Sequence, residues 1–149
     1  MIVATEQLPE LAGTVAMVDG GFDPLHHGHV AYFRAASELG APLLCNLAPD
    51  AWVSAKHPPL LPQAERAIVI DAIRYVTYVH LADSATADVL TTLRPRYYVK
   101  GADWRDRLPE AEVELCAAHG IEIVFLDTVL DSSTAILRRY ADDSQVSIP

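Results

Sequence analysis

The chain has 149 residues, of which 51% are hydrophobic and 21% charged, and its formal net charge at pH 7 is -9. This length and balance predict one soluble globular domain, and the negative charge argues against binding along a nucleic-acid backbone. No apolar run is long enough to cross a membrane, and residues 1–13 lack the basic start and apolar core of a signal peptide. The two cysteines lie far apart and form no disulfide framework, so we expect a cytoplasmic protein without a membrane partner.

Apolar runs and helix-like spacings alternate along the chain, between an N-terminal arm at residues 1–13 and a tail at residues 142–149 that we expect to fray. The expected strands cover residues 15–18, 42–47, 78–81, 97–99 and 121–125, and the expected helices 31–39, 65–75, 83–93, 108–119 and 132–140. Asp83 and Ser84 offer an N-cap, and Gly120 offers a C-cap. The alternation predicts a single α/β domain over residues 1–149. We expect a Rossmann-like, open, parallel, five-stranded sheet with helices on both faces.

The turn after the first strand carries the strongest chemical signal. It contains Gly20 and Gly21, which allow the backbone to turn sharply. His26 and His29 lie three residues apart at the start of the following helix, where free N–H groups and the positive end of the helix dipole favour an anion. Together with Gly28, which admits close approach, the two imidazoles predict a seat for a polyphosphate. A zinc site would need further ligands, and the Gly-x-Gly-x-x-Gly pattern of dinucleotide sites is absent.

Three other segments also follow strands, so they should lie at the same edge of the sheet as this turn. The first is a proline-rich loop over residues 52–62, and the others are residues 100–104 and the segment that opens the last helix at Ser132. The chain has nine arginines but only two lysines, Lys56 and Lys100. Either lysine alone reads as an ordinary surface residue, but both fall in these loops. Their placement favours contact with an anionic ligand.

The whole turn resembles the G-x-F-D-x-x-H-x-G-H motif of the cytidylyltransferase-like nucleotidyltransferases, and the matching residues are Gly20, Phe22, Asp23, His26, Gly28 and His29. Residues 64–76 resemble the family's E-R…L-x-x-V-D element, with Thr77 in place of the usual acid. Residues 99–104 resemble the V-K-G-x-D-[WY] loop of the ADP-heptose synthase type, and residues 132–136 resemble S-[ST]-T-x-I. In register, these motifs cover about residues 15–139.

The resemblance implies an enzyme that transfers a nucleoside monophosphate from ATP or CTP to a small phosphorylated metabolite and releases pyrophosphate. The implied catalytic residues are His26, His29 and Lys56. The implied nucleotide-binding residues are Gly20, Gly21, Phe22, Gly28, Lys100, Gly101, Asp103, Ser132, Ser133 and Thr134. The implied substrate-binding residues are Asp50, Arg66 and Trp104, while Asp23 is expected to brace the turn. Mg²⁺ would be bound mainly through the nucleotide phosphates, without a protein metal site, in a homodimer.

Departures from the family pattern leave the base and the acceptor open. Before the last helix, CTP-dependent glycerol-phosphate enzymes have R-T-E-G-I-S-T-T, but this chain lacks the arginine and has Leu130 in place of the glycine. This difference favours a heptose 1-phosphate-like acceptor, with the glycerol-3-phosphate type as the alternative. Adenylyltransferases of coenzyme synthesis share His-x-Gly-His but fit the Lys100 loop less well. The altered loops at Pro58-Pro59 and Leu130 also leave open a nucleotide-binding regulatory domain without turnover.

Overall fold

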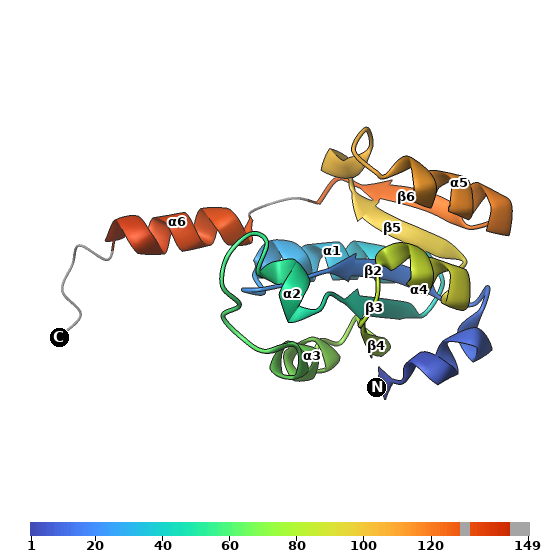
Figure 1. Ribbon diagram of the computed structural model, residues 1–149, viewed down its shortest axis with the longest axis horizontal. Helices are drawn as coiled ribbons and strands as arrows, with labels where there is room; N and C mark the ends of the chain where they lie inside the picture. Colours follow the sequence, from blue (N-terminus) through green and yellow to red (C-terminus); the bar gives the residue numbers. More distant parts are fainter. Residues whose placement is uncertain (129–131, 144–149) are drawn as a thin grey trace.

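The computed structural model describes residues 1–128 and 132–143 and contains one open sheet with helices packed on it (Figure 1). The strands are β1 (Ile2–Val3), β2 (Ala16–Gly20), β3 (Leu43–Leu47), β4 (Tyr78–Leu81), β5 (Tyr97–Gly101) and β6 (Glu122–Leu126). Every neighbouring pair is parallel, and the strand order is β1-β4-β3-β2-β5-β6. The Rossmann-like architecture expected from the sequence is therefore confirmed.

The sheet has six strands, so the expected number of five is wrong. The N-terminal arm supplies the extra strand, because Ile2 pairs with Val79 and Val3 with His80 at the edge of β4. A 3₁₀ helix, η1 (Thr5–Leu11), follows and buries Leu8 completely. Two residues are too few for an alternating pattern to be recognised, which is why sequence periodicity does not reveal β1.

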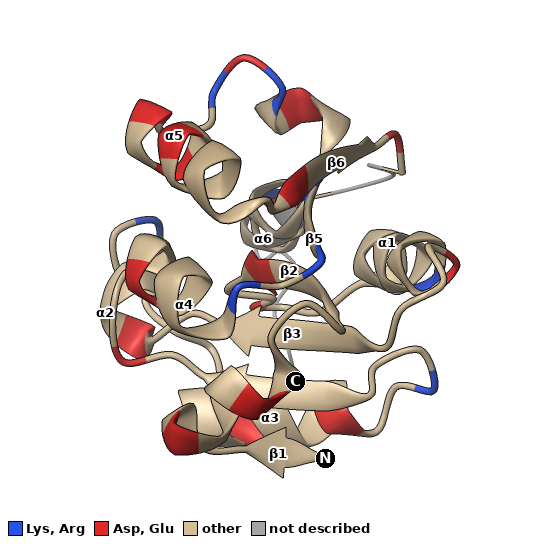
Figure 2. Cartoon of the chain, turned by 90° about the vertical axis from the view of Figure 1, so that its right-hand side faces the viewer, with Lys and Arg blue, Asp and Glu red and all other residues tan. Residues whose placement is uncertain are grey.

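Helices α1 (His27–Ser37) and α3 (Gln63–Asp71) cover one face of the sheet, and α4 (Thr86–Leu93) and α5 (Glu110–His119) cover the other (Figures 1 and 2). The short helices α2 (Asp50–Val53) and η2 (Ala102–Trp104) follow β3 and β5, and α6 (Ser133–Asp143) extends away from the sheet (Figure 1). One apolar cluster joins α1 and α3 to the sheet, including Phe33 and Ile70. A second cluster packs η1, α4 and α5 on the other face, including Leu90 and Cys116.

Several helix ends differ from the expected ones for local reasons. The first helix begins at His27 rather than residue 31, because the His26 side chain accepts a hydrogen bond from the Gly28 N–H as an N-cap. Helix α4 begins at Thr86, and neither Asp83 nor Ser84 caps it. Gly120 is confirmed as a C-cap, with a φ of 68° that suits glycine.

The last helix extends further towards the C-terminus than the sequence predicts. Helix α6 continues through Asp143, so residues 142 and 143 are helical rather than part of a frayed tail. Residues 144–149 lie outside the described residues, and so does the altered loop position Leu130. Within residues 1–128 and 132–143, no helix combines the length and apolar character that crossing a bilayer requires.

Strand β2 is the point where the order of the sheet reverses. From β2 the chain moves to β3 and β4 on one side, and then returns to β5 and β6 on the other. In open parallel sheets, ligands bind beyond the carboxyl ends of the strands at such a point. A ligand site is therefore expected among the loops that follow β2, β3 and β5.

Candidate active site

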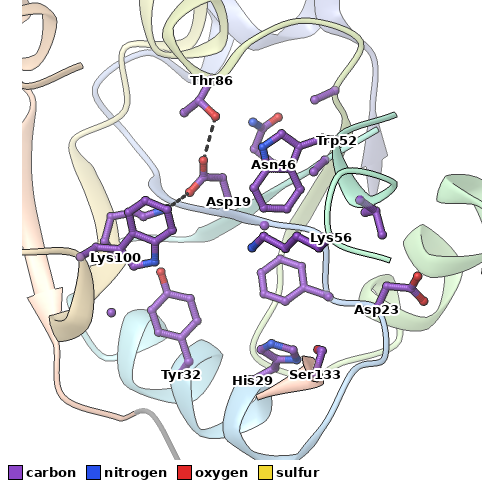
Figure 3. Close-up of a pocket in the computed structure, with 18 of the residues that line it drawn as sticks. Asp19, Asp23, His29, Tyr32, Asn46, Trp52, Lys56, Thr86, Lys100 and Ser133 are labelled. Carbon is purple, nitrogen blue, oxygen red and sulfur yellow. Dashed lines mark hydrogen bonds and ion pairs between the residues drawn. The ribbon is translucent and has the colours of Figure 1, made fainter. Parts of the chain in front are cut away.

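A cavity of about 930 Å³ opens at the carboxyl ends of the central strands (Figure 3). Its wall includes the turn after β2, the loop after β3, the end of β5 and the start of α6. Every predicted site residue except Asp50 and Arg66 lines this cavity. The parallel sheet thus brings together segments that are more than a hundred residues apart in the chain.

The two histidines of the turn form a stacked pair at the start of α1. Their ring centroids are 3.7 Å apart. The Gly28 N–H donates to Nδ1 of His26 over 3.1 Å, and the His26 N–H donates to Nδ1 of His29 over 3.3 Å. Because each Nδ1 accepts a hydrogen, a neutral ring carries its proton on Nε2. His29 therefore offers an N–H donor at the cavity wall, at the positive end of a helix dipole.

Burial and the neighbouring His26 lower the pKa of His29 from 6.5 to about 3. The ring is therefore neutral near pH 7 when no anion is bound. In the unfolded chain this histidine binds a proton below about pH 6.5, whereas the native ring does not until about pH 3. The unfolded state thus holds more protons in between, so this histidine costs stability as the pH falls from 6.5 towards 3.

We therefore expect His29→Asn to weaken the acid sensitivity of the fold. Between about pH 4 and 6, the free energy of unfolding of the variant should fall less steeply than that of the wild type, by up to about 1.4 kcal/mol per pH unit. Urea unfolding at a series of pH values measures this slope. The same replacement at the exposed neighbour His27 is the control, and equal slopes for all three proteins would contradict the assignment.

The two glycines of the turn allow close packing against Phe22 and Val53. A Cβ at Gly20 would lie 3.0 Å from the Phe22 ring, and one at Gly21 would lie 3.0 Å from Val53. The Phe22 ring meets the His29 ring edge-on, with centroids 4.9 Å apart. The Phe22 ring therefore packs against the His29 ring and helps to fix its orientation.

Lys100 reaches the cavity as a buried cation with a carboxylate partner. Its Nζ lies 2.9 Å from Oδ1 of Asp19 and 4.3 Å from the centre of the Trp104 ring. The other oxygen of Asp19 accepts from the Thr86 hydroxyl over 2.9 Å. Asp19 was not predicted as a site residue. Its signal in the sequence is an acid at the end of an apolar strand, directly before the two glycines.

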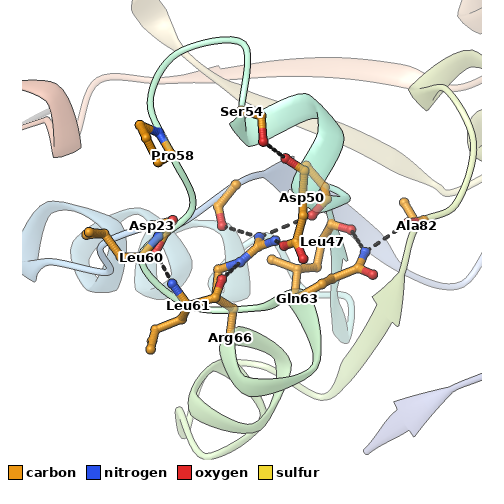
Figure 4. A network of polar contacts seen from close by, with 12 residues as sticks. Asp23, Leu47, Asp50, Ser54, Pro58, Leu60, Leu61, Gln63, Arg66 and Ala82 are labelled. Carbon is orange, nitrogen blue, oxygen red and sulfur yellow. Dashed lines mark hydrogen bonds and ion pairs between the residues drawn. The ribbon is translucent and has the colours of Figure 1, made fainter.

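Lys56 is exposed on the loop after α2, and its Nζ lies 4.5 Å from the centre of the Trp52 ring. Asp23 holds this loop to the turn, because its buried carboxylate accepts from the backbone N–H groups of Leu60 (2.7 Å) and Leu61 (3.3 Å). The bracing role expected for Asp23 thus has a structural basis. It fixes the segment that carries Lys56 rather than the turn alone (Figure 4).

Asp50 and Arg66 do not line the cavity but pair with each other behind the turn. The side chain of Arg66 is 1% exposed, and its Nη2 lies 2.6 Å from Asp50 Oδ1. Its other nitrogens donate to backbone carbonyls, those of Gly21 (2.7 Å), Ala48 (3.1 Å) and Leu61 (3.0 Å) (Figure 4). The two side chains join three loops, so the geometry favours a bracing role over the expected contact with substrate.

The remaining predicted residues lie on the cavity wall at the ends of β5 and α6. Gly101, Asp103 and Trp104 continue β5 into η2. The Ser132 hydroxyl accepts from the Ala135 N–H over 3.0 Å, and the Ser133 hydroxyl donates to the Pro24 carbonyl over 2.9 Å. The serines therefore cap α6 and tie it to the turn, while Thr134 also lines the cavity.

The cavity wall also contains residues that were not predicted, among them Asp19, Tyr32, Asn46, Trp52, Asp83 and Thr86. The Tyr32 hydroxyl donates to the Val99 carbonyl over 2.7 Å, and burial raises its pKa well above 10. Asn46 is the polar residue of the apolar β3 sequence Leu-Leu-Cys-Asn-Leu. A polar residue inside an apolar strand is a usable signal for a site beside the sheet edge. The described residues contain no group of three His, Cys, Asp or Glu side chains placed to hold a metal ion.

Comparisons with known proteins agree with this arrangement. The cytidylyltransferase-like family model matches residues 17–139. The Bifunctional protein HldE of Syntrophotalea carbinolica is 37% identical over 136 residues, which cover 87% of this chain, and that of Gluconobacter oxydans is 38% identical over 130 residues, which cover 84%. The match spans only 27% of the length of either relative.

A solved structure supports the fold alone. The lipopolysaccharide core biosynthesis protein from Thermoplasma volcanium superposes with a TM-score of 0.65 at 22% identity, over 77% of this chain and 97% of the other. The family match, in contrast, covers most of the sequence and includes the two histidines and the cavity loops. The chain therefore belongs to the cytidylyltransferase-like family of nucleotidyltransferases.

Proposed function

We propose that this protein transfers a nucleoside monophosphate from ATP or CTP to a small sugar phosphate, with a heptose 1-phosphate-like acceptor preferred, and releases pyrophosphate. The observation that carries the proposal is the stacked His26–His29 pair at the N-terminus of α1, in a cavity at the point where the strand order reverses. The similarity to proteins named Bifunctional protein HldE and the Lys100–Trp104 segment support the sugar-phosphate acceptor.

In the proposed reaction, an oxygen of the acceptor's phosphate attacks the α-phosphorus of the triphosphate. A new P–O bond forms, the bond from the α-phosphorus to the bridging oxygen breaks, and pyrophosphate leaves with that electron pair. Such transfers depend mainly on alignment and on stabilising charge in the transition state. No covalent enzyme intermediate is required.

The histidines would donate from Nε2 to phosphate oxygens and stabilise the growing negative charge. A bound triphosphate favours a protonated ring, so it would raise the low pKa of His29 towards its ordinary value. Lys56, on the braced loop, would add a positive charge at the cavity wall.

Around the nucleotide, Gly20, Gly21, Phe22 and Gly28 would shape the phosphate seat. Lys100, Gly101 and Asp103 would face the base or ribose, and Ser132, Ser133 and Thr134 would face the phosphates from the N-terminus of α6. Mg²⁺, when bound, would neutralise phosphate charge. Asp19 offers an oxygen ligand at the cavity wall, but both of its oxygens are already paired, so we propose that the ion is carried mainly on the nucleotide.

Pyrophosphate release from ATP and from CTP, with heptose 1-phosphate and glycerol 3-phosphate as acceptors, tests this function. We expect turnover with heptose 1-phosphate to exceed that with glycerol 3-phosphate. A protein that binds either nucleotide but releases no pyrophosphate with any acceptor would instead be a regulatory nucleotide-binding domain.

Lys56→Ala should raise the apparent KM for the triphosphate by about tenfold, because a charge-assisted hydrogen bond is worth roughly 1.5–3 kcal/mol. Lys56→Arg keeps the charge on the same loop and should recover most of the loss. Steady-state kinetics with varied nucleotide measures both. If the alanine variant keeps the wild-type KM, Lys56 is an ordinary surface lysine.

A further inference from the structure

Asn46 is a buried polar side chain on the cavity wall that the proposed reaction does not use. It lies at the carboxyl end of β3 and is 2% exposed. Its Oδ1 lies 2.8 Å from Nδ1 of His80, which is 1% exposed. The other ring nitrogen of His80 lies 2.9 Å from the Thr5 hydroxyl oxygen in η1. A chain of hydrogen bonds thus runs from the N-terminal arm to the cavity.

The donor and the acceptor of each of these hydrogen bonds can be assigned from the chemistry of the groups. An amide oxygen can only accept, so Nδ1 of His80 donates to it. Nε2 of the neutral ring must then accept, and the Thr5 hydroxyl donates to it. The Asn46 amide is therefore held with its oxygen towards His80 and its Nδ2 on the other side. Across residues 1–128 and 132–143, no protein group accepts a hydrogen bond from this Nδ2, so its two hydrogens are available to a ligand.

The position of Asn46 points to the acceptor rather than the nucleotide. A transferase must seat two substrates, and the cavity extends to both sides of β2. The β5 side carries Lys100, Gly101 and Asp103, which we have proposed for the nucleotide. Asn46 lies on the β3 side, on a wall shared with Asp19 and Thr86 (Figure 3).

The charge of this wall also indicates which part of the acceptor it meets. Asp19 lies in register with Asn46 but is already paired with Lys100 and Thr86, whereas Asp83 also lines the cavity. The Asp83 carboxylate repels a phosphate but accepts hydrogen bonds from hydroxyl groups, while an amide N–H donates to a hydroxyl oxygen. A neutral, hydroxyl-bearing group therefore suits both kinds of side chain.

We propose that Asn46 donates from Nδ2 to an oxygen of the hydroxyl-bearing part of the acceptor, and that His80 and Thr5 are positioning residues that hold the amide in this orientation. The inference rests on the proposed function and adds a side chain that recognises the acceptor. It also gives the N-terminal arm a part in substrate recognition.

The replacement Asn46→Asp separates this role from a structural one. The aspartate keeps an oxygen for His80 but replaces the cavity-facing donor with an acceptor. We expect the KM for heptose 1-phosphate to rise at least about tenfold, while the KM for ATP or CTP stays near the wild-type value. An unchanged KM for heptose 1-phosphate, or a rise confined to the nucleotide KM, would overturn the inference.

The positioning role is tested at Thr5, which does not line the cavity. Thr5→Val removes the hydroxyl with little change of shape, and we expect a rise of about threefold in the acceptor KM with kcat and nucleotide KM retained. Thr5→Ser restores a hydroxyl and should return the acceptor KM to the wild-type value. If valine and serine behave alike, while circular dichroism shows both variants folded, the arm does not position Asn46.

Phosphoethanolamine, whose cationic group would also suit carboxylates, tests the acceptor class. The inference expects it to be a poorer acceptor than heptose 1-phosphate, and a better turnover would overturn it. A wild-type protein without turnover on any acceptor would refute the proposed function and this inference with it. An active wild type whose Asn46→Asp variant has unchanged constants would refute the inference alone.

Discussion

His29→Ala should lower kcat/KM by about two to three orders of magnitude, the usual loss when one preorganised donor to a transition-state oxyanion is removed. The ring is held by the His26 N–H on Nδ1 and by the Phe22 ring on its edge, so its Nε2–H is fixed before substrate arrives. Steady-state pyrophosphate release with saturating acceptor measures the effect.

His27→Ala is the matched control for this experiment. His27 is exposed on the same turn of α1 and does not line the cavity, so its loss should leave kcat/KM within about twofold of the wild type. Circular dichroism and urea unfolding of both variants show whether the fold is retained. A folded His29→Ala protein with wild-type activity would remove the histidine from the mechanism.

Arg66→Met should lower the free energy of unfolding by about 3 kcal/mol or more, because it removes the donors of a buried guanidinium and leaves three carbonyls without that partner. Methionine fills much of the same volume, so the loss reports the hydrogen bonds rather than a cavity. The Asp50 side chain is 46% exposed, so its charge alone adds little to the cost. Urea unfolding at pH 7 gives the difference directly.

Arg34→Met provides the comparison for an exposed arginine. Arg34 pairs with Glu38 one helical turn away, and both side chains are 66% exposed. Such a pair contributes about 0.5 kcal/mol or less. If Arg66→Met costs no more than Arg34→Met, Arg66 does not brace the loops, and the contact with substrate expected from the sequence regains its support.

Sequence pattern alone predicts much of the fold because strands and helices of ordinary length leave a clear periodicity. The apolar run of β3 and the C-cap at Gly120 are both recognisable in this way. The edge strand β1 is not, because two residues carry no period. Its formation depends on pairing with β4, which is distant in the chain.

The candidate site shows the same division between local and tertiary information. A motif places a residue in a loop, and the parallel sheet then brings the loops together, so residues such as His29 and Lys56 lie at the cavity as predicted. The direction of a long side chain is decided by its neighbours in space, as Arg66 shows by turning to carbonyls. The role proposed for Asn46 depends on its hydrogen bond to His80 and, through His80, on Thr5. No local sequence pattern connects these residues.

The most direct test of the whole account is a crystal structure of the protein with a nonhydrolysable ATP or CTP analogue and Mg²⁺. We predict that the triphosphate lies at the N-terminus of α1, with phosphate oxygens within hydrogen-bond distance of Nε2 of His26 and His29. A nucleotide bound away from the end of β2, or phosphates that contact neither ring, would contradict the account.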